Sequence, residues 1–596
     1  MENQRLLLFA ALMFVLFLLW QNWMEFKAKK YPPPAPPVAT APAGVAGQAG
    51  VPAPPAPGQD VLPAAPTVGT GPQALGGGQR VHVATDLFDA EIDTVGGDLR
   101  RVGLRTYPES IEQRDQPFQL LKDSGPEIFI AQSGLLAPSN GPAPNHNAPF
   151  SAEQTEYRLA DGQDALEVRL HWSDPSGVKV IKTYTFRRGS FLVELNQRVE
   201  NGGASDWQGA QYRQFQRTPP KTSSSFFGSG VITYTGAVIS TPEERYQKIS
   251  FDDIAKQELN KSVKDGWIAM IQHYFLGAWI PNAGETDDFY TKVVGGNRYV
   301  VGMRGAVQAV PVGATGDFRT RLYVGPKLPD VLSDIAPNLH LTVDYGALTI
   351  IAEPLFWLLK WIHAIVGNWG WAIIFLTILI KLAFYKLSET SYRSMANMRR
   401  LAPELTRLKE LYGEDKQRMN QEMMALYKRE KVNPLGGCLP ILVQIPVFIA
   451  LYWVLVESVQ LRQAPFMLWI KDMAIPDPYY VLPLIMGVTM FVQQKLSPAP
   501  PDPVQAKVMM ALPVVFTFMF LWFPAGLVLY WVVNNMLSIA QQWVITKRVE
   551  SGADSGKNAA QGGGKVAAAV GKQVGKLVDL AKQSLAGPTK PGKRRK

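Results

Sequence analysis

One lysine in an apolar stretch of this 596-residue chain is the residue with the clearest chemical meaning. Residues 369–384 read WGWAIIFLTILIKLAF, and Lys381 is the only ionisable side chain among them. An ionisable group inside a membrane-spanning helix is costly, so such groups usually line a substrate path or a water-filled cavity. We therefore expect Lys381 to lie in a hydrophilic groove.

Other polar residues recur at helical spacing in the neighbouring apolar segments. Thr377 lies one turn before Lys381 on the same helix face, and Gln444 lies in another segment. The last segment carries one polar stripe, formed by Tyr530, Asn534, Ser538 and Gln541. In hydrocarbon these groups need partners or water, which favours a groove. The alternative is that they only form hydrogen bonds that hold helices together.

Lys381 also has a second interpretation. It lies seven residues before Ser388, where a polar loop begins, and this distance is about 10 Å of helix. The long side chain could therefore snorkel to the membrane interface. The residues alone leave this alternative open.

The chain carries no pattern that predicts catalysis or a bound metal. Its six histidines are scattered without ligand spacing, and the single cysteine, Cys438, excludes an intrachain disulfide framework. Neither a nucleophile elbow nor a phosphate-binding loop is present. We therefore expect a protein that is not an enzyme and that binds no cofactor and no metal.

Six apolar segments predict transmembrane helices. The first forms an N-terminal anchor at 1–23, for which a cleaved secretory signal is the alternative. The other five form a core at 367–549, with helices expected near 368–387, 439–459, 479–494, 509–523 and 527–545. An amphipathic helix at 351–366 is expected to lie in the membrane interface, although it could instead begin the next transmembrane helix.

The remaining chain predicts a tethered soluble domain. Residues 24–80 are rich in Pro, Ala and Gly, which is typical of a linker. From 81 to 345 the chain shows short period-two runs, such as Leu166, Val168 and Leu170, separated by turn signals. This pattern predicts an antiparallel β-sandwich. The expected fold class is a membrane α-helical bundle with a large β-sandwich domain.

Basic residues predict the orientation in the membrane. The loop Ser388–Gly436 has ten Lys or Arg against seven Asp or Glu, and the tail at 550–596 is also basic. Both lie on the same side by helix parity, and basic loops mark the cytoplasmic side. We expect a multi-pass protein of a cell inner membrane, with both termini cytoplasmic and the β domain periplasmic.

The cytoplasmic loop at 388–431 is expected to fold as a hairpin of two amphipathic helices. Apolar residues recur there at three- and four-residue spacing, and they include Met395, Met398, Leu405, Met419, Met423 and Tyr427. Flexible methionines can form an adaptable contact surface for other proteins. Alternatively, they only pack the two helices against each other.

Several ordered motifs resemble a known family. They are MMALYKREKVNPLGG at 423–437, LRQAPFMLW at 461–469, DPYYVLPLIMG at 477–487, LWFPAGLVLY at 521–530 and the N-terminal MENQRLLL. These motifs resemble the YidC family of bacterial membrane-protein insertases, which is related to the mitochondrial oxidase-assembly and chloroplast thylakoid insertases. The shared core covers about 351–549, and the outer domain resembles only the Gram-negative branch.

The resemblance implies a six-span protein with a periplasmic β-supersandwich. It also implies a five-helix core around a groove that is open to the cytoplasm and lipid. The family usually has an arginine at the position of Lys381, so this chain keeps the charge but loses the forked guanidinium. Thr377 and Trp531 match a polar and an aromatic groove position of the family.

The resemblance further implies the partners. Nascent membrane proteins would be inserted and helped to fold, alone or with the Sec translocon and its accessory subunits. The ribosome and the signal-recognition receptor would meet the hairpin and the basic tail, and lipids would surround the core. A secondary transporter with a buried cation is the alternative, but it predicts inverted repeats that the chain does not display. A sugar-processing enzyme would need an acid/base constellation, which the chain also lacks.

Overall fold

The computed structural model describes residue 75 and residues 77–138, 141–220, 233–295, 297–413, 415–430, 439–497 and 503–550. The described chain forms two compact units. The β unit comprises the described parts of 40–344 together with Glu457–Gln463, and the helical unit comprises those of 345–456 and 464–550. The predicted anchor, most of the linker and the basic tail after residue 550 lie outside the described residues.

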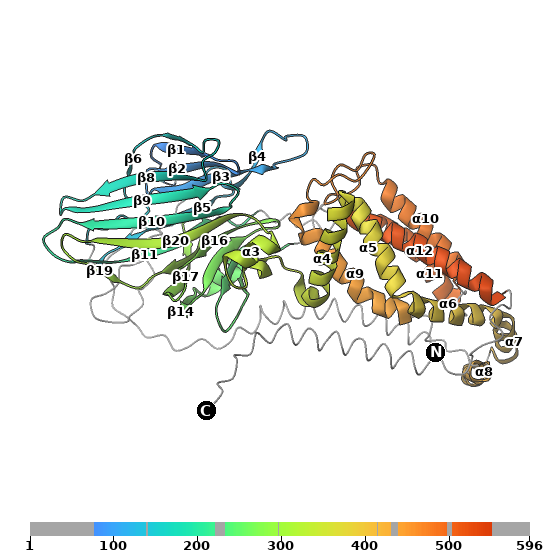
Figure 1. The fold of residues 1–596 in the computed structure, drawn as a ribbon. Helices are drawn as coiled ribbons and strands as arrows, with labels where there is room; N and C mark the ends of the chain where they lie inside the picture. The colour runs from blue at the N-terminus through green and yellow to red at the C-terminus, as the bar shows by residue number, and fades with distance from the viewer. Residues whose placement is uncertain are drawn as a thin grey trace, which may run out of the picture. The chain divides into compact units, whose positions relative to one another are not determined.

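The β unit contains two large sheets (Figure 1). The first has the order β14–β17–β18–β11–β5–β3–β2–β1–β7, with β19 beside β11 and β4 beside β3. Its strands are β1 (Arg80–Ala84), β2 (Phe88–Asp93), β3 (Asp98–Pro108), β4 (Pro117–Leu121), β5 (Phe129–Leu136), β7 (Glu156–Arg158), β11 (Trp207–Arg217), β14 (Asn260–Lys264), β17 (Thr286–Val294), β18 (Arg298–Arg304) and β19 (Gln308–Val310).

The second sheet has the order β13–β12–β15–β16–β20–β10–β9–β8–β6. Its strands are β6 (Ser151–Ala152), β8 (Ala165–Ser173), β9 (Val178–Arg187), β10 (Leu192–Asn201), β12 (Gly236–Ser240), β13 (Gln247–Ile249), β15 (Trp267–Ile271), β16 (Phe275–Ile280) and β20 (Thr315–Pro326). Apart from the parallel pair β1–β7, the pairings are antiparallel. The predicted antiparallel sandwich is therefore confirmed.

The meander β8–β9–β10 shows why the sequence folds in this way. Alternate residues along β9 are buried while their neighbours are half-buried or exposed, because successive side chains point to opposite faces of a strand. Gly177 and Gly189, in the two turns, have φ values of 93° and 70°, which glycine adopts without steric cost. Between the sheets, Trp279 of β16 packs on Phe215 of β11 with 5.9 Å between ring centroids.

The helical unit follows the β unit in the sequence. Its helices are α4 (Thr349–Val366), α5 (Trp369–Ala383), α6 (Tyr385–Arg400), α7 (Ala402–Tyr412), α8 (Lys416–Arg429), α9 (Leu439–Glu457), α10 (Val481–Leu496), α11 (Pro503–Phe520) and α12 (Ala525–Glu550). The last of these contacts α5, α6 and α10 (Figure 1).

Helix lengths give limited support to the predicted spans. By length and composition, one described helix, Gly346–Val366, could cross a membrane. The pair α5 and α6 is a second candidate, although it is bent by 68° at the break. Three shorter apolar helices cover Gln444–Glu457, Val481–Leu496 and Ala506–Phe520. Six transmembrane helices therefore stay a prediction.

The segment after α5 differs in detail from the expected two-helix hairpin. It contains three helices, because the run expected as one helix divides at Leu401 into α6 and α7. Pro403 lies in the first turn of α7. Proline lacks an amide hydrogen and is tolerated only at the start of a helix, which explains the division. The helices α7 and α8 form a shorter hairpin than expected, and Arg429 pairs with Glu404 across it at 3.1 Å.

Candidate functional site

The Lys381 side chain is buried near the end of α5. Asn368 caps the start of this helix by accepting a hydrogen bond from the Trp371 amide at 3.1 Å. Lys381 lies three turns later and is 6% exposed. Its Nζ donates to Ser538 Oγ of α12 at 2.7 Å, and Ser538 Oγ donates to the Asn534 carbonyl oxygen at 2.7 Å. This contact favours an interior position of the ammonium over snorkelling.

A second hydrogen bond joins the predicted polar residues of α9 and α12. Gln444 Nε2 donates to Asn534 Oδ1 at 2.5 Å. Lys381, Gln444, Asn534 and Ser538 thus come together from three helices that are far apart in the sequence. Thr377 is buried, but its hydroxyl donates to the Ile373 carbonyl of its own helix at 2.7 Å. The structure therefore brings together most of the predicted polar set, with Thr377 turned to its own backbone.

The two aromatic residues of the predicted site pack on α9. Tyr530 is buried and stacks on Phe448 with 6.0 Å between centroids. Trp531 meets the same ring edge-on at 4.8 Å, and it also contacts Phe520 of α11 at 5.7 Å. These rings form an apolar wall next to Gln444, which lies one turn before Phe448 on α9.

Three polar contacts of this unit were not predicted. Asn535 Nδ2 donates to Thr489 Oγ1 at 3.3 Å, and Gln542 Nε2 donates to the Leu496 carbonyl at 3.1 Å, so both face α10. Their spacing of seven residues was a visible signal for a second polar stripe on α12. Tyr392 of α6 is buried and its hydroxyl interacts with Ser538. Its sequence surroundings gave no such signal, because the bend after α5 is what brings α6 to α12.

The buried charge of Lys381 has no carboxylate beside it in the described chain. In the part of the chain that the structure describes, no carboxylate forms an ion pair with it, and no cluster of His, Cys, Asp or Glu could hold a metal ion. An ammonium group has three N–H donors, and a hydroxyl oxygen compensates its charge only in part. The site can therefore attract a carboxylate or another polar group through the remaining donors.

The predicted hairpin residues take intermediate positions. Met395, Met398, Leu405, Met419 and Met423 are half-buried, whereas Tyr427 is buried. Leu411 and Met424, which are adjacent to this set, are 64% and 42% exposed. Half-burial suits both packing between the helices and contact with another protein, so both interpretations stay open.

Two family models match the chain, and the boundary between them lies within α4, close to the start of the helical unit. The YidC periplasmic domain family matches residues 80–358, and the 60Kd inner membrane protein family matches residues 361–552. A protein of Methylococcus capsulatus named membrane protein insertase YidC is 56% identical over 484 residues, which are 81% of this chain and 88% of that protein. The chain belongs to the YidC family.

A further relative agrees with this membership, and one solved structure is similar over part of its fold. The protein of the same name from Nitrosococcus oceani is 54% identical over 476 residues, covering 80% of this chain and 87% of that protein. Among solved structures, a crystal structure of an active YidC insertase covers 78% of this chain and 92% of its own, at 16% identity and a TM-score of 0.34. Membership in the YidC family does not favour the secondary transporter or the sugar-processing enzyme.

Proposed function

We propose that this chain is a membrane protein insertase and membrane chaperone, and that it works by positioning rather than by covalent chemistry. The observation that carries the proposal is the buried Lys381 ammonium, which is bonded to one hydroxyl and lies in a family whose relatives are named insertases. The polar residues around it, Gln444, Asn534 and Ser538, would form the wet side of a groove that is open to the cytoplasm.

In this mechanism a hydrophobic segment of a nascent protein slides along α9 and α11 into lipid. Its polar or acidic tail passes through the groove, where the Lys381 charge lowers the cost of removing the tail from water. The membrane potential would add about 2.3 kcal/mol for each acidic charge per 100 mV. No nucleotide is needed, because the hydrophobic segment supplies free energy when it enters lipid.

The other parts of the chain have supporting roles in the proposal. The hairpin of α7 and α8 would receive the nascent chain, and the ribosome and signal-recognition receptor would meet it and the basic tail. The Sec translocon and its accessory subunits would share part of the substrates. The β unit would lie in the periplasm and both termini in the cytoplasm. The amphipathic helix α4 would lie in the interface, with Trp357 and Trp361 exposed to lipid headgroups.

The decisive experiment replaces Lys381 and measures insertion of a single-span protein with a short acidic tail. We expect Lys381→Ala and Lys381→Glu to lower insertion about tenfold or more, since they remove or invert the charge. Lys381→Arg should retain it. Lys386→Ala is the matched control, because that lysine follows α5 closely but its side chain is 91% exposed.

A second substrate distinguishes the effect of the Lys381 charge on insertion from the effect of the groove as a whole. The same single-span protein with a neutral tail should be inserted by Lys381→Ala almost as well as by the unaltered protein. If Lys381→Ala and Lys381→Glu insert the acidic-tail substrate normally, the charge mechanism is wrong. If the unaltered protein inserts neither substrate, the insertase proposal itself is wrong.

A further inference from the structure

The chain leaves the β unit after Asp344 and returns to it at Glu457, the last residue of α9. Each of these carboxylates pairs with a lysine of the β unit. Lys248 Nζ contacts Asp344 Oδ2, and Lys327 Nζ lies 3.6 Å from Glu457 Oε2. Charged pairs are therefore found both where the chain leaves the β unit and where it re-enters it.

The Lys327–Glu457 pair lies in the protein interior. The Lys327 side chain is 2% exposed and the Glu457 side chain is 4% exposed. Removing a charge from water is costly, and only the attraction of a close partner offsets the cost. The burial of each of these two residues therefore depends mainly on the other.

The four charges interact as one cluster. Burial lowers the pKa of Lys327 below its ordinary value, the attraction of Glu457 and Asp344 opposes this effect, and the positive charge of Lys248 adds to it. Two lysines and two carboxylates leave the cluster without net charge. The Lys248 and Asp344 side chains are more open to water, at 40% and 23% exposed. Breaking the buried Lys327–Glu457 pair is therefore the most costly change within the cluster.

The segment Glu457–Gln463 belongs to the β unit. Its residues Val459 and Leu461 are each 1% exposed. The amides of Leu461 and Arg462 donate to the carbonyl oxygens of Ser458 and Val459, both at 3.1 Å, so the segment contains one short helical turn. These two amides exchange with water when the turn opens, and their rates therefore report whether the segment is in place.

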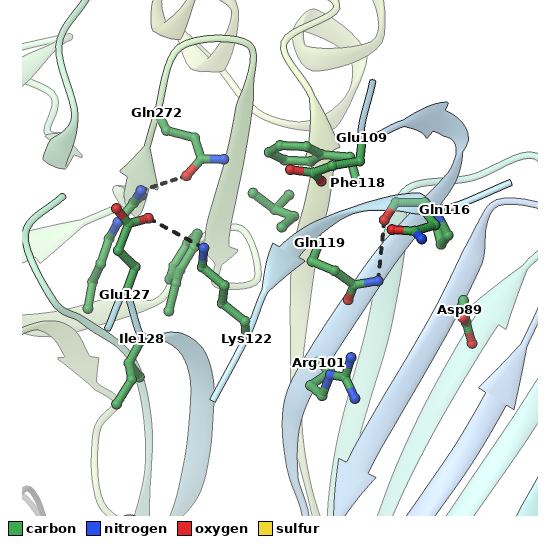
Figure 2. Close-up of a pocket in the computed structure, with 14 residues that line it drawn as sticks. Asp89, Arg101, Glu109, Gln116, Phe118, Gln119, Lys122, Glu127, Ile128 and Gln272 are labelled. Carbon is green, nitrogen blue, oxygen red and sulfur yellow. Dashed lines mark hydrogen bonds and ion pairs between the residues drawn. The ribbon is translucent and has the colours of Figure 1, made fainter. Parts of the chain in front are cut away.

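The far end of the segment binds the corner between β3 and β4. Arg462 Nη2 donates to the carbonyl oxygens of Pro108 and Glu109 at 2.8 and 3.0 Å. Its guanidinium also lies 5.4 Å from the centroid of the Phe118 ring. Figure 2 shows Glu109 and Phe118 at this corner, where both line a pocket. Charged side chains thus fix the segment at both ends, with Glu457 at its first residue and Arg462 near its last.

We propose that Lys248, Lys327, Asp344 and Glu457 form a latch, which holds the segment Glu457–Gln463 on the β unit when closed and releases it when the Lys327–Glu457 pair separates. The two charges compensate each other in the closed state, and water hydrates them in the open state. Such a pair holds less firmly than well-packed apolar residues of similar volume. The segment can therefore open locally while the two sheets stay folded.

Opening of the latch also affects α9. Because Glu457 is the last residue of α9, separation of the Lys327–Glu457 pair frees this end of the helix from the β unit. The latch is thus a conformational device built into the β unit. It does not depend on Lys381 or on the insertase activity.

Hydrogen exchange of the full-length protein in detergent tests the latch. Lys327→Met removes one charge of the pair and leaves the Glu457 carboxylate buried. We expect the amides of Leu461 and Arg462 to exchange about tenfold faster or more, because the closed state loses its charge compensation. Amides in β9 and β10 should keep their rates, which shows that the sheets stay folded.

Two further variants show whether burial of the pair matters. Lys261→Met breaks a pair with Glu243 whose side chains are 41% and 71% exposed, and it should leave the exchange of the segment unchanged. Asp344→Asn should accelerate this exchange less than Lys327→Met does, because the pair that it breaks is partly hydrated.

A charge swap separates electrostatics from packing. Lys327→Glu places a second carboxylate beside Glu457 and should accelerate exchange of the segment at least as much as Lys327→Met. Adding Glu457→Lys restores an ion pair with the charges reversed, so the double variant should exchange more slowly than Lys327→Glu alone.

Three results would contradict the latch. The amides of Leu461 and Arg462 could exchange at the same rate in Lys327→Met and in the unaltered protein. They could accelerate together with the amides of β9 and β10, in which case the segment does not open by itself. Finally, the charge-swapped double variant could exchange as fast as Lys327→Glu, which would mean that packing and not charge holds the segment.

Discussion

Lys182 and Lys381 are both buried, one in each unit, and their surroundings differ. Lys182 of β9 has a fully buried side chain, and its Nζ donates to the carbonyl oxygens of Gly96 and Ser133 at 2.9 and 3.0 Å. It also meets the buried Asp98 carboxylate of β3 at 3.4 Å. Lys381 of α5 is bonded to the hydroxyl of Ser538. In the described chain no carboxylate pairs with it.

The difference separates a structural charge from an available one. Lys182 has an acceptor for each of its three donors and a counter-charge, so it joins the two sheets and has no capacity left for a ligand. Lys381 has one hydroxyl partner in the described chain, and we propose that a passing polar group uses its other donors and its charge. Burial alone therefore does not mark a functional lysine, and the number of its partners is the better criterion.

The largest expected effect tests the structural lysine. Lys182→Met removes the ammonium 3.4 Å from the buried Asp98 carboxylate and leaves only Arg100, at 3.9 Å, which should lower the free energy of unfolding of the β unit by about 3–5 kcal/mol. Hydrogen exchange of the amides in β3 and β9 measures this loss in the full-length protein. Lys179→Met, at an exposed position of the same strand, should have no such effect.

A double variant tests the cause of that loss. Lys182→Met with Asp98→Leu removes both charges and should restore much of the stability, since a buried pair can often be replaced by apolar groups. A double variant that is as unstable as Lys182→Met would show that packing, and not the Asp98 charge, is responsible.

The pH dependence of the β unit is the second test. Burial raises the pKa of Asp98 from 3.8 to about 6 and lowers the pKa of Lys182 from 10.5 to about 8, against the attraction of the two charges. Between pH 3.8 and 6 the folded state holds more protons, so stability falls as the pH rises. Between pH 8 and 10.5 the unfolded state holds more protons, so stability rises with pH.

The two groups therefore destabilise the β unit most between about pH 6 and pH 8. We expect the stability of the unaltered protein, relative to the Lys182→Met, Asp98→Leu double variant, to be lowest in this window. Hydrogen exchange at several pH values, corrected for the intrinsic exchange rate, measures the difference. A difference that does not change with pH would mean that the pair keeps ordinary pKa values.

A smaller effect is expected at the polar contacts around the available lysine. Gln444→Leu removes the hydrogen bond to Asn534 Oδ1 and should lower the unfolding free energy of the helical unit by about 1 kcal/mol, as is usual for polar contacts between membrane helices. Combining it with Asn534→Leu in a double-mutant cycle isolates the contact. If the free-energy changes of the two single variants add up exactly in the double variant, the two side chains do not interact.

The smallest stability effect is expected at Lys381 itself. Lys381→Met removes a charge that lacks a carboxylate partner, so the unfolding free energy of the helical unit should change by less than about 1 kcal/mol. Thermal unfolding in detergent measures this change. A loss of unfolding free energy as large as that of Lys182→Met would show that Lys381 is a structural residue, like Lys182.

Local sequence patterns predicted a large part of both units. The period-two runs and glycine turns identified β8, β9 and β10, because alternation and turn geometry are local properties. The same alternation places Lys182 in line with Val178, Val180 and Tyr184, so its burial could have been inferred from parity alone. The identity of its partner could not be inferred in this way, because Asp98 lies 84 residues away. In the helical unit, spacing identified Lys381, Asn534 and Ser538 but not the bend that brings Tyr392 to them.

The sequence by itself determined which residues are anomalous, since a single lysine in an apolar run and one on the core face of a strand are both visible without coordinates. Tertiary structure decided what each anomaly means. A buried charge is defined by its partners, and these come from distant segments: Gly96, Asp98 and Ser133 for Lys182, and Ser538, which lies 157 residues away, for Lys381. Only packing shows that the first set contains a carboxylate and two carbonyl oxygens, whereas the second, in the described chain, contains one hydroxyl.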